Sequence, residues 1–201
     1  MSVPITVIIG LLGILFGAWF QRRHWLRSVA EEVRVRETKD ASELIELIAT
    51  TFDRRIAAQR AFLHSIGDVN REAEISKYRE AINEYGEKIN TIRSKLFFYF
   101  SYSEVYDYEE ELHNRLIING ANITRLYKEV VREESEDLNS RKEELDKDLS
   151  LLSAKVFRSC RNLYGKVALL EFGTLRKIHD WQNPNNEYVS SMKLARKVLN
   201  I

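Results

Sequence analysis

Four histidines and a single cysteine are the residues of this 201-residue chain best suited to metal binding or nucleophilic catalysis. One histidine lies in the stretch EELH, where Glu110 and His113 have the Glu-x-x-His spacing of di-iron helical bundles. Such a site needs a second Glu-x-x-His pair and a glutamate on each of two further helices. No other histidine has a glutamate three residues before it. The sequence therefore predicts no metal and no cofactor, and His113 is interpreted as a surface or seam residue of its helix.

The remaining candidates for catalysis are equally weak. Cys160 falls on an apolar helical line, which predicts a buried and unreactive thiol. His179 and Asp180 are adjacent in IHDW, and neighbouring positions on a helix point in different directions. Neither glycine-rich phosphate-binding pattern occurs. We therefore expect no catalytic residue, no small-molecule substrate and no enzymatic activity.

A basic face is the only hint of nucleic-acid binding. Lys155, Arg158, Asn162 and Lys166 share one side of a predicted helix. The chain as a whole has a net charge of only +1. A nucleic-acid-binding domain is expected to carry a clear positive excess, so nucleic acid is not an expected partner.

The N-terminal stretch from Val3 to Phe20 is the strongest signal in the sequence. It contains 18 residues without a charge, and as a helix it would measure about 27 Å, close to the roughly 30 Å of a bilayer core. A cleaved signal peptide is disfavoured because MSVP carries no basic residue and AWFQRRHW offers no small-residue cleavage site. A buried core helix would show a polar face. The prediction is a permanent single-pass membrane anchor over residues 1–26.

The residues after this stretch predict its orientation. Trp19 and Trp25 are placed as interfacial aromatic residues, and Arg22 and Arg23 form a basic flank with no Lys or Arg before it. This asymmetry puts the N-terminus outside and the C-terminal part in the cytoplasm, at the inner membrane if the source is bacterial. The lone Cys160 suits a reducing compartment.

Three glycines fall on one face of the predicted anchor. Gly10, Gly13 and Gly17 are three and four residues apart, a spacing that lets two helix backbones approach closely. The alternative is that glycine is simply common in membrane helices. On the first interpretation the chain forms a homo-oligomer.

The rest of the chain reads as long helices, because only five of the eight glycines and one of the two prolines lie beyond the anchor. One apolar line alternates three- and four-residue steps over three heptads: Ile75, Tyr78, Ile82, Tyr85, Ile89, Ile92, Leu96 and Tyr99. A helix before it is expected to start at a capping box formed by Asp40 and Glu43. The charged stretch 27–40 is either a helical stalk or an irregular linker.

Two further long helices complete the predicted fold. One starts near Ser103 and runs to the mid-130s, and the other starts near Ser140 with Glu143 completing a second capping box. The apolar line of the latter is Leu145, Leu149, Leu152, Val156, Cys160, Leu163, Val167 and Leu170. A short amphipathic helix over 187–201 follows NPNN. The expected class is all-α: a transmembrane helix, then an antiparallel four-helix-type cytoplasmic bundle over 41–182.

Antiparallel helices bring the second helix back toward the membrane at its aromatic C-terminal end. Phe97, Phe98 and Phe100 are therefore candidates for contact with the membrane surface, together with the basic residues of the last helix, Lys193, Arg196 and Lys197. The alternative is that the aromatic residues cap the bundle core and the charges are solvated.

These observations favour a non-enzymatic membrane protein whose bundle scaffolds, senses or regulates through contacts with an unidentified protein partner. One alternative is a membrane-perturbing effector, such as a toxin or defence component, assembled through the glycine face. Another is a bundle enzyme or cofactor carrier.

Overall fold

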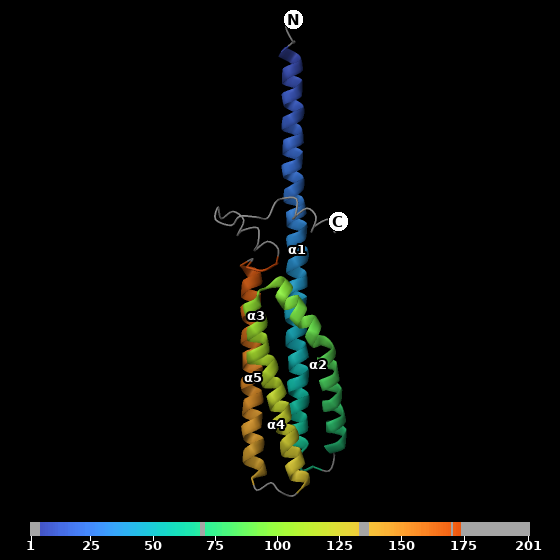
Figure 1. Ribbon diagram of the computed structural model, residues 1–201, viewed down its shortest axis with the longest axis vertical. Coiled ribbons are helices and arrows are strands. Elements are labelled where there is room, and N and C mark those ends of the chain that lie inside the picture. Colours follow the sequence, from blue (N-terminus) through green and yellow to red (C-terminus); the bar gives the residue numbers. More distant parts are fainter. Residues whose placement is uncertain (1–4, 69–70, 133–136, 170, 174–201) are drawn as a thin grey trace. The chain divides into compact units, whose positions relative to one another are not determined.

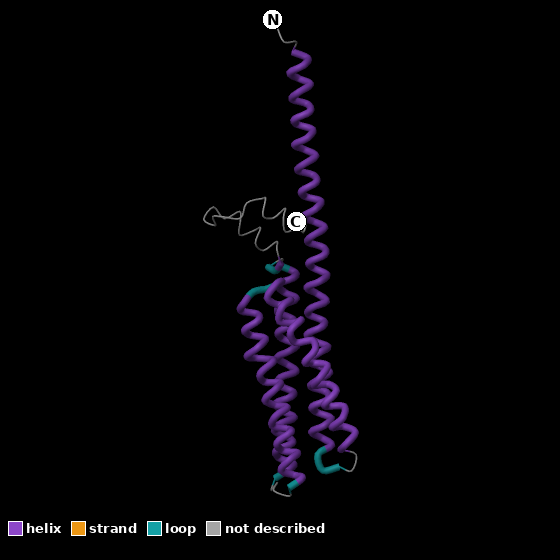
Figure 2. The backbone as a smooth tube through the Cα atoms, turned by 45° about the vertical axis from the view of Figure 1, so that its right-hand side comes forward, coloured by secondary structure: helices purple, strands orange, loops and turns teal. Residues whose placement is uncertain are grey.

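The computed structural model describes residues 5–68, 71–132, 137–169 and 171–173, without the side chains of 5–9 and 11. All regular secondary structure in these residues is helical, which confirms the all-α class (Figures 1 and 2). The chain divides into two units, Met1–Asp40 and Ala41–Ile201. No helix in the described part of the chain is both long enough and apolar enough to cross a membrane.

Helix α1, Ile5–Ser65, is continuous and belongs to both units. Residues 18–66 contain no glycine or proline, so nothing in the sequence interrupts the helix. The stretch 27–40 is therefore helical rather than irregular. The capping box predicted at Asp40 and Glu43 is wrong, because no helix begins there. Gly67, with φ of 95°, follows the end of the helix and supplies the left-handed residue that commonly terminates one.

Helix α2, Arg71–Tyr99, contains the whole of the apolar line predicted from Ile75 to Tyr99. Ser101 is extended, with φ of −148° and ψ of 175°, and turns the chain into α3, Tyr102–Asp107. The next six residues, Tyr108–His113, form a π-helix, η1, which passes directly into α4, Asn114–Val131. The sequence predicted one uniform helix here and gave no sign of the π-helical turn.

Helix α5, Leu138–Ala168, closes the described part of the fold. Its N-cap is Asp137, so the second predicted capping box is wrong: Ser140 lies inside the first turn instead of before it. In the second unit successive long helices run in opposite directions, as Figure 1 shows, which gives the expected antiparallel arrangement. Leu170 and the predicted helix 187–201 lie outside the described residues.

The core of the second unit contains side chains from every one of its helical segments except α3. Phe52 of α1 is completely buried at its centre. Its ring makes edge contacts with Tyr85 of α2 at 5.5 Å and with Tyr108 of η1 at 5.7 Å between centroids. The apolar line predicted for α5 is buried from Leu145 to Val167. Periodicity therefore identified the core-facing sides of α2 and α5 correctly.

Candidate functional site

The residues predicted to serve the N-terminal segment all lie on the exposed surface of α1 in the first unit. Around Gly10, Gly13 and Gly17 no described atom lies within 4 Å of the position that a Cβ would take. Trp19 is 51% exposed and Trp25 55%. Arg22 and Arg23 are exposed, and the Arg23 guanidinium lies 5.3 Å from the centre of the Trp19 ring.

The aromatic run at the end of α2 is divided between surface and core. Phe97 and Phe98 are 65% and 52% exposed. Phe100 is buried, with its ring 6.2 Å from that of Phe172. The expectation that Phe100 lies at the surface is therefore wrong, because the chain turns at Ser101 and directs this side chain inward. Lys193, Arg196 and Lys197 lie outside the described residues.

The residues that the sequence offers for metal binding and catalysis have different environments. Glu110 is exposed, whereas His113 is partly buried. Among the described residues, no group of three or more His, Cys, Asp or Glu side chains could hold a metal ion. Cys160 is buried as predicted. Burial raises the pKa of its thiol to about 11, which keeps it protonated and unreactive at neutral pH.

The second unit contains a cluster of buried polar side chains that sequence reasoning did not find. We call it the polar layer; it comprises Arg55 and Gln59 of α1, Tyr78 and Tyr85 of α2, and Tyr108 and His113 of η1. All six side chains are at least partly buried. The predicted apolar line of α2 includes Tyr78 and Tyr85, and the sequence points to none of these six residues as a polar cluster, so the polar layer is the principal unexpected feature of the bundle.

Tyr85 and His113 form the centre of the polar layer. Their rings stack, with centroids 5.7 Å apart and an interplanar angle of 9°. The Tyr85 hydroxyl lies 2.7 Å from Nδ1 of His113. Burial lowers the pKa of His113, which favours the neutral ring. A neutral Nδ1 then accepts a hydrogen bond from the tyrosine hydroxyl, because burial raises the pKa of Tyr85 to about 12 and keeps it protonated.

The π-helical turn explains how η1 contributes two residues to one layer. Its wider backbone ring, i to i+5, places residues five apart on the same side of the helix. Tyr108 and His113 stand five apart at its two ends, and both contribute to the polar layer. Between them Glu109 forms a bidentate ion pair with Arg93 of α2, whose Nε and Nη2 each donate to one carboxylate oxygen. A regular helix would have spread these two rings over different faces.

Arg55 is the most unusual member of the layer. It is only 7% exposed. Its guanidinium carbon lies 4.5 Å from the centre of the Tyr85 ring, a cation–π contact. Burial lowers its pKa, and the neighbouring groups that oppose this effect are the hydroxyls of Tyr78 and Tyr85. No described carboxylate forms an ion pair with it, and its Nε has no hydrogen-bond partner.

Gln59 and Tyr78 connect the polar layer to α4. The side-chain nitrogen of Gln59 donates to the backbone carbonyl of Leu116 at 2.9 Å. A Cβ at Gly120 would lie 2.5 Å from the Tyr78 hydroxyl and 2.7 Å from the Gln59 nitrogen. Glycine is therefore required at position 120 for these two side chains to approach the helix backbone as closely as they do.

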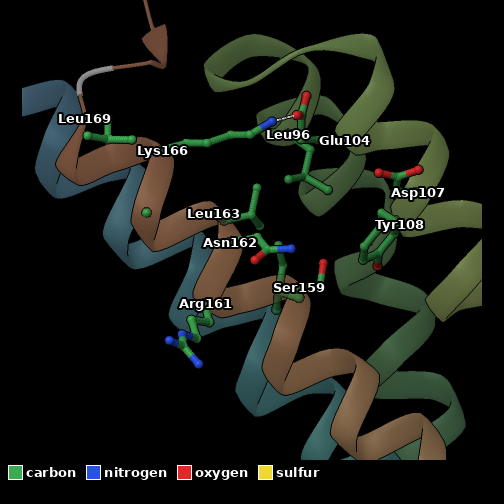
Figure 3. A pocket seen from close by; sticks show the side chains of 12 residues that line it. Leu96, Glu104, Asp107, Tyr108, Ser159, Arg161, Asn162, Leu163, Lys166 and Leu169 are labelled. Atoms are coloured by element: carbon green, nitrogen blue, oxygen red, sulfur yellow. Dashed lines mark hydrogen bonds and ion pairs between the residues drawn. The ribbon is translucent and has the colours of Figure 1, made fainter.

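Two hollows adjoin the polar layer. The first, which we call the Tyr108 cavity, has a volume of about 490 Å³ and is lined by residues of α1, α2, α3, η1 and α5. Figure 3 shows Tyr108 and Asp107 on one side of it and the ion pair of Lys166 with Glu104 crossing between α5 and α3. Burial raises the pKa of Tyr108, and its hydroxyl lies beside that of Tyr85 without a hydrogen bond of good geometry.

The second hollow, the Arg55 groove, has a volume of about 460 Å³ and is more open. Its lining residues come from α1, α2 and α4: Arg55, Tyr78, Ile117, Gly120, Ala121, Thr124, Arg125 and Lys128. Arg125 and Lys128 are exposed. The groove therefore presents three cationic side chains and no carboxylate.

Two tyrosines of the polar layer carry no charge at neutral pH. Tyr85 and Tyr108 stay protonated because burial raises the pKa of each. A signal for the layer was present in the sequence. Positions 78, 85 and 108 carry tyrosine instead of an aliphatic residue, and Arg55 and Gln59 continue the helical spacing of the apolar stripe of α1 after Phe52. Periodicity alone counts tyrosine as apolar and cannot show which helices these residues share.

The chain matches no family model, no curated protein and no solved structure.

Proposed function

We propose that this chain is a non-enzymatic, membrane-anchored protein whose helical bundle acts as a scaffold or sensor through contacts with other proteins. In this proposal the N-terminal segment holds the chain in a membrane and self-associates. The bundle over 41–182 then lies on the cytoplasmic side and engages a protein partner.

The observation that carries this proposal is the surface of α1 in the first unit. Its large apolar side chains are about half exposed or more over nearly four turns: Leu12, Ile14, Leu15, Phe16, Trp19, Phe20, Trp25 and Leu26. Leu12 alone is just below half, at 49%. Contiguous exposed apolar surface of this extent marks a membrane or protein contact. The exposed side chains surround the helix instead of forming one stripe, which favours lipid over a single protein groove.

The membrane part of the proposal also rests on the sequence. The uncharged run begins at Val3, before the described residues, and extends to Phe20. Arg22 and Arg23 follow it directly, and Trp19 and Trp25 bracket that basic pair. This order of apolar core, aromatic belt and basic flank is typical of a membrane-spanning helix entering the cytoplasm.

Self-association is proposed through the glycine face. Gly10, Gly13 and Gly17 leave open space beside the helix backbone. A second copy of the same helix could approach closely there, as in other small-residue helix pairs.

Extraction of membranes from expressing cells tests the anchor. Full-length protein should stay in the pellet after alkaline carbonate treatment and enter solution only with detergent. Release by carbonate would contradict the anchor and indicate a peripheral or soluble protein.

Light scattering of detergent-solubilised protein tests the glycine face. Gly13→Leu/Gly17→Leu should reduce the molar mass to that of a monomer. Leu15→Phe adds bulk to the opposite face of the helix and should leave the assembly intact. A monomeric wild-type protein would refute self-association, and equal masses for wild type and Gly13→Leu/Gly17→Leu would show that assembly uses another surface.

A further inference from the structure

The Arg55 groove contains a buried positive charge that the described part of the protein does not neutralise. Arginine is almost never fully buried unless it is paired, and moving a cation out of water is strongly unfavourable without a counter-charge. Arg55 is 7% exposed, and the groups that interact with it are the Tyr85 ring and the Tyr78 hydroxyl. Its Nε is a buried donor without an acceptor. The site is therefore short of one negatively charged acceptor.

The remaining lining of the groove adds two more positive charges without a counter-charge. Arg125 and Lys128 stand one turn apart on the exposed side of α4, and neither forms an ion pair within the described residues. Elsewhere on α4 and η1, charged side chains do form ion pairs with a neighbouring helix: Glu129 pairs with Arg141 and Glu111 with Lys155. Three cations thus converge on one hollow that no Asp or Glu lines.

The shape and remaining chemistry of the groove narrow the class of ligand. Tyr78 and Thr124 contribute hydroxyls, and Ile117 and Ala121 contribute an apolar wall. Its volume of about 460 Å³ is in the range of small-molecule sites. Arginine and lysine together with hydroxyl donors are the groups that recognise phosphate, since a guanidinium can bond two oxygens at once.

We propose that the Arg55 groove binds a small phosphate-bearing anion, with Arg55 bonding it at the base and Arg125 and Lys128 at the rim. The bound phosphate supplies the counter-charge that Arg55 lacks among the described residues. Gly120 contributes by having no side chain, because a Cβ there would displace the Tyr78 hydroxyl from the floor of the groove. The proposal is independent of the membrane anchor, since every residue it uses lies in the second unit.

Titration calorimetry of the full-length protein in non-ionic detergent tests the site, with inorganic pyrophosphate as the probe at constant ionic strength. We expect saturable binding with one site per chain. Removing both rim charges, Arg125→Ser/Lys128→Ser, should weaken binding about tenfold or more, as loss of charge-assisted hydrogen bonds does. Both residues are exposed, so this variant should fold normally. Lys147→Ser removes an exposed charge from α5, away from the groove lining, and should bind like wild type.

The variant Arg55→Met removes the buried charge and keeps the volume. It should abolish detectable binding while preserving the far-ultraviolet circular dichroism spectrum of a helical protein. If it fails to fold, the rim variant alone decides. The proposal is overturned if pyrophosphate shows no saturable binding, if the rim variant binds as tightly as wild type, or if Lys147→Ser weakens binding to the same extent.

Two further probes identify the source of the phosphate. ATP represents a soluble phosphate ester, and dihexanoyl phosphatidic acid below its micellar concentration represents a lipid headgroup. Tighter binding of ATP supports a soluble ligand, and tighter binding of the phosphatidic acid supports a headgroup. None of these outcomes affects the membrane-anchor proposal, which carbonate extraction tests separately.

Discussion

Helix α5 and the polar layer occupy the same bundle and are built on opposite principles. The buried side of α5 is an unbroken apolar line from Leu145 to Val167 on one regular helix of 31 residues. The polar layer takes its six side chains from three separate segments, includes a π-helical turn, and leaves polar atoms of Arg55, Gln59 and Tyr108 without partners. An apolar line stabilises the fold wherever it packs. A buried donor or acceptor left without a partner costs about 1–3 kcal/mol.

The apolar line of α5 stabilises the fold, whereas the unpartnered polar atoms of the polar layer reduce stability. A bundle built only for stability would fill the positions of Arg55 and Gln59 with aliphatic residues. Places where a chain departs from local rules without compensation are expected to be functional. The anion proposed for the Arg55 groove supplies such a compensation. The contrast between the two regions can be tested by changes matched in size.

The largest effect is expected from the apolar line. Leu149 is completely buried, and Leu149→Ala should lower the free energy of unfolding by about 2–5 kcal/mol through lost burial and a residual cavity. Leu151 is two residues away and 56% exposed, so Leu151→Ala should change stability by less than about 0.5 kcal/mol. Urea denaturation of full-length protein, followed by circular dichroism, measures both. Equal effects would contradict the assignment of this face to the core.

The second largest effect is expected from a pair of glycines, Gly120 beside the polar layer and Gly165 on α5. The methyl group of Gly120→Ala pushes the Tyr78 hydroxyl and the Gln59 amide away from the backbone of α4. The substitution should destabilise the protein by about 1–3 kcal/mol, as overpacking does. Gly165 of α5 has open space around it, so Gly165→Ala should stabilise by up to about 1 kcal/mol through helix propensity. The same urea assay compares them. Stabilisation by both substitutions would show that the polar layer accommodates a methyl group freely.

The sequence predicted the regular parts of this molecule and missed the irregular one. Periodicity located the buried sides of α2 and α5 because each helix packs along one stripe and every third or fourth residue reports it. Capping boxes failed twice. Asp40 and Glu43 lie within a helix that simply continues, and the helix near Ser140 starts earlier, at Leu138. Local capping motifs cannot show whether a helix already exists on their N-terminal side.

The contacts within the polar layer could not be predicted from the sequence, for a different reason. A π-helical turn needs one inserted residue, and no residue type in YEEELH requires it. The contacts of Tyr85 with His113 and of Arg55 with Tyr85 join residues 28 and 30 positions apart. Such pairings depend on the register between helices, which a single apolar stripe leaves undetermined. Phe100 illustrates the same limit, because one extended residue at Ser101 separates it from its exposed neighbours.

A smaller effect is expected from the hydrogen bond at the centre of the layer. Tyr85→Phe keeps the ring against Phe52 and Arg55 and removes only the hydroxyl bonded to His113. The free energy of unfolding should fall by about 1 kcal/mol. Tyr164 is 46% exposed on α5, and Tyr164→Phe should have no measurable effect. Urea denaturation at pH 7.5 provides the comparison, and an unchanged stability for Tyr85→Phe would remove this bond from the account of the layer.

The smallest effect is a change of stability with pH that only the polar layer should show. Burial, together with the charges of Arg93 and Arg55, lowers the pKa of His113, and Glu109 opposes this. The unfolded chain has a histidine pKa of about 6.5. Below that pH the unfolded state therefore binds a proton more readily than the folded state, so the contribution of neutral His113 is present above about pH 6.5 and is lost as the pH falls.

The variant His113→Asn isolates this contribution, because asparagine can accept the Tyr85 hydrogen bond and does not titrate. Urea denaturation from pH 8 to pH 5 should show wild type losing stability relative to the variant below about pH 6.5. Subtracting the free energies of unfolding of the two proteins removes the contribution of every titratable group that they share, including the charged residues along α5. A difference that stays constant over this range would mean that His113 takes up a proton as readily in the bundle as in the unfolded chain. The polar layer would then be more hydrated than its burial indicates, and the cost of leaving Arg55 without a counter-charge would be correspondingly smaller.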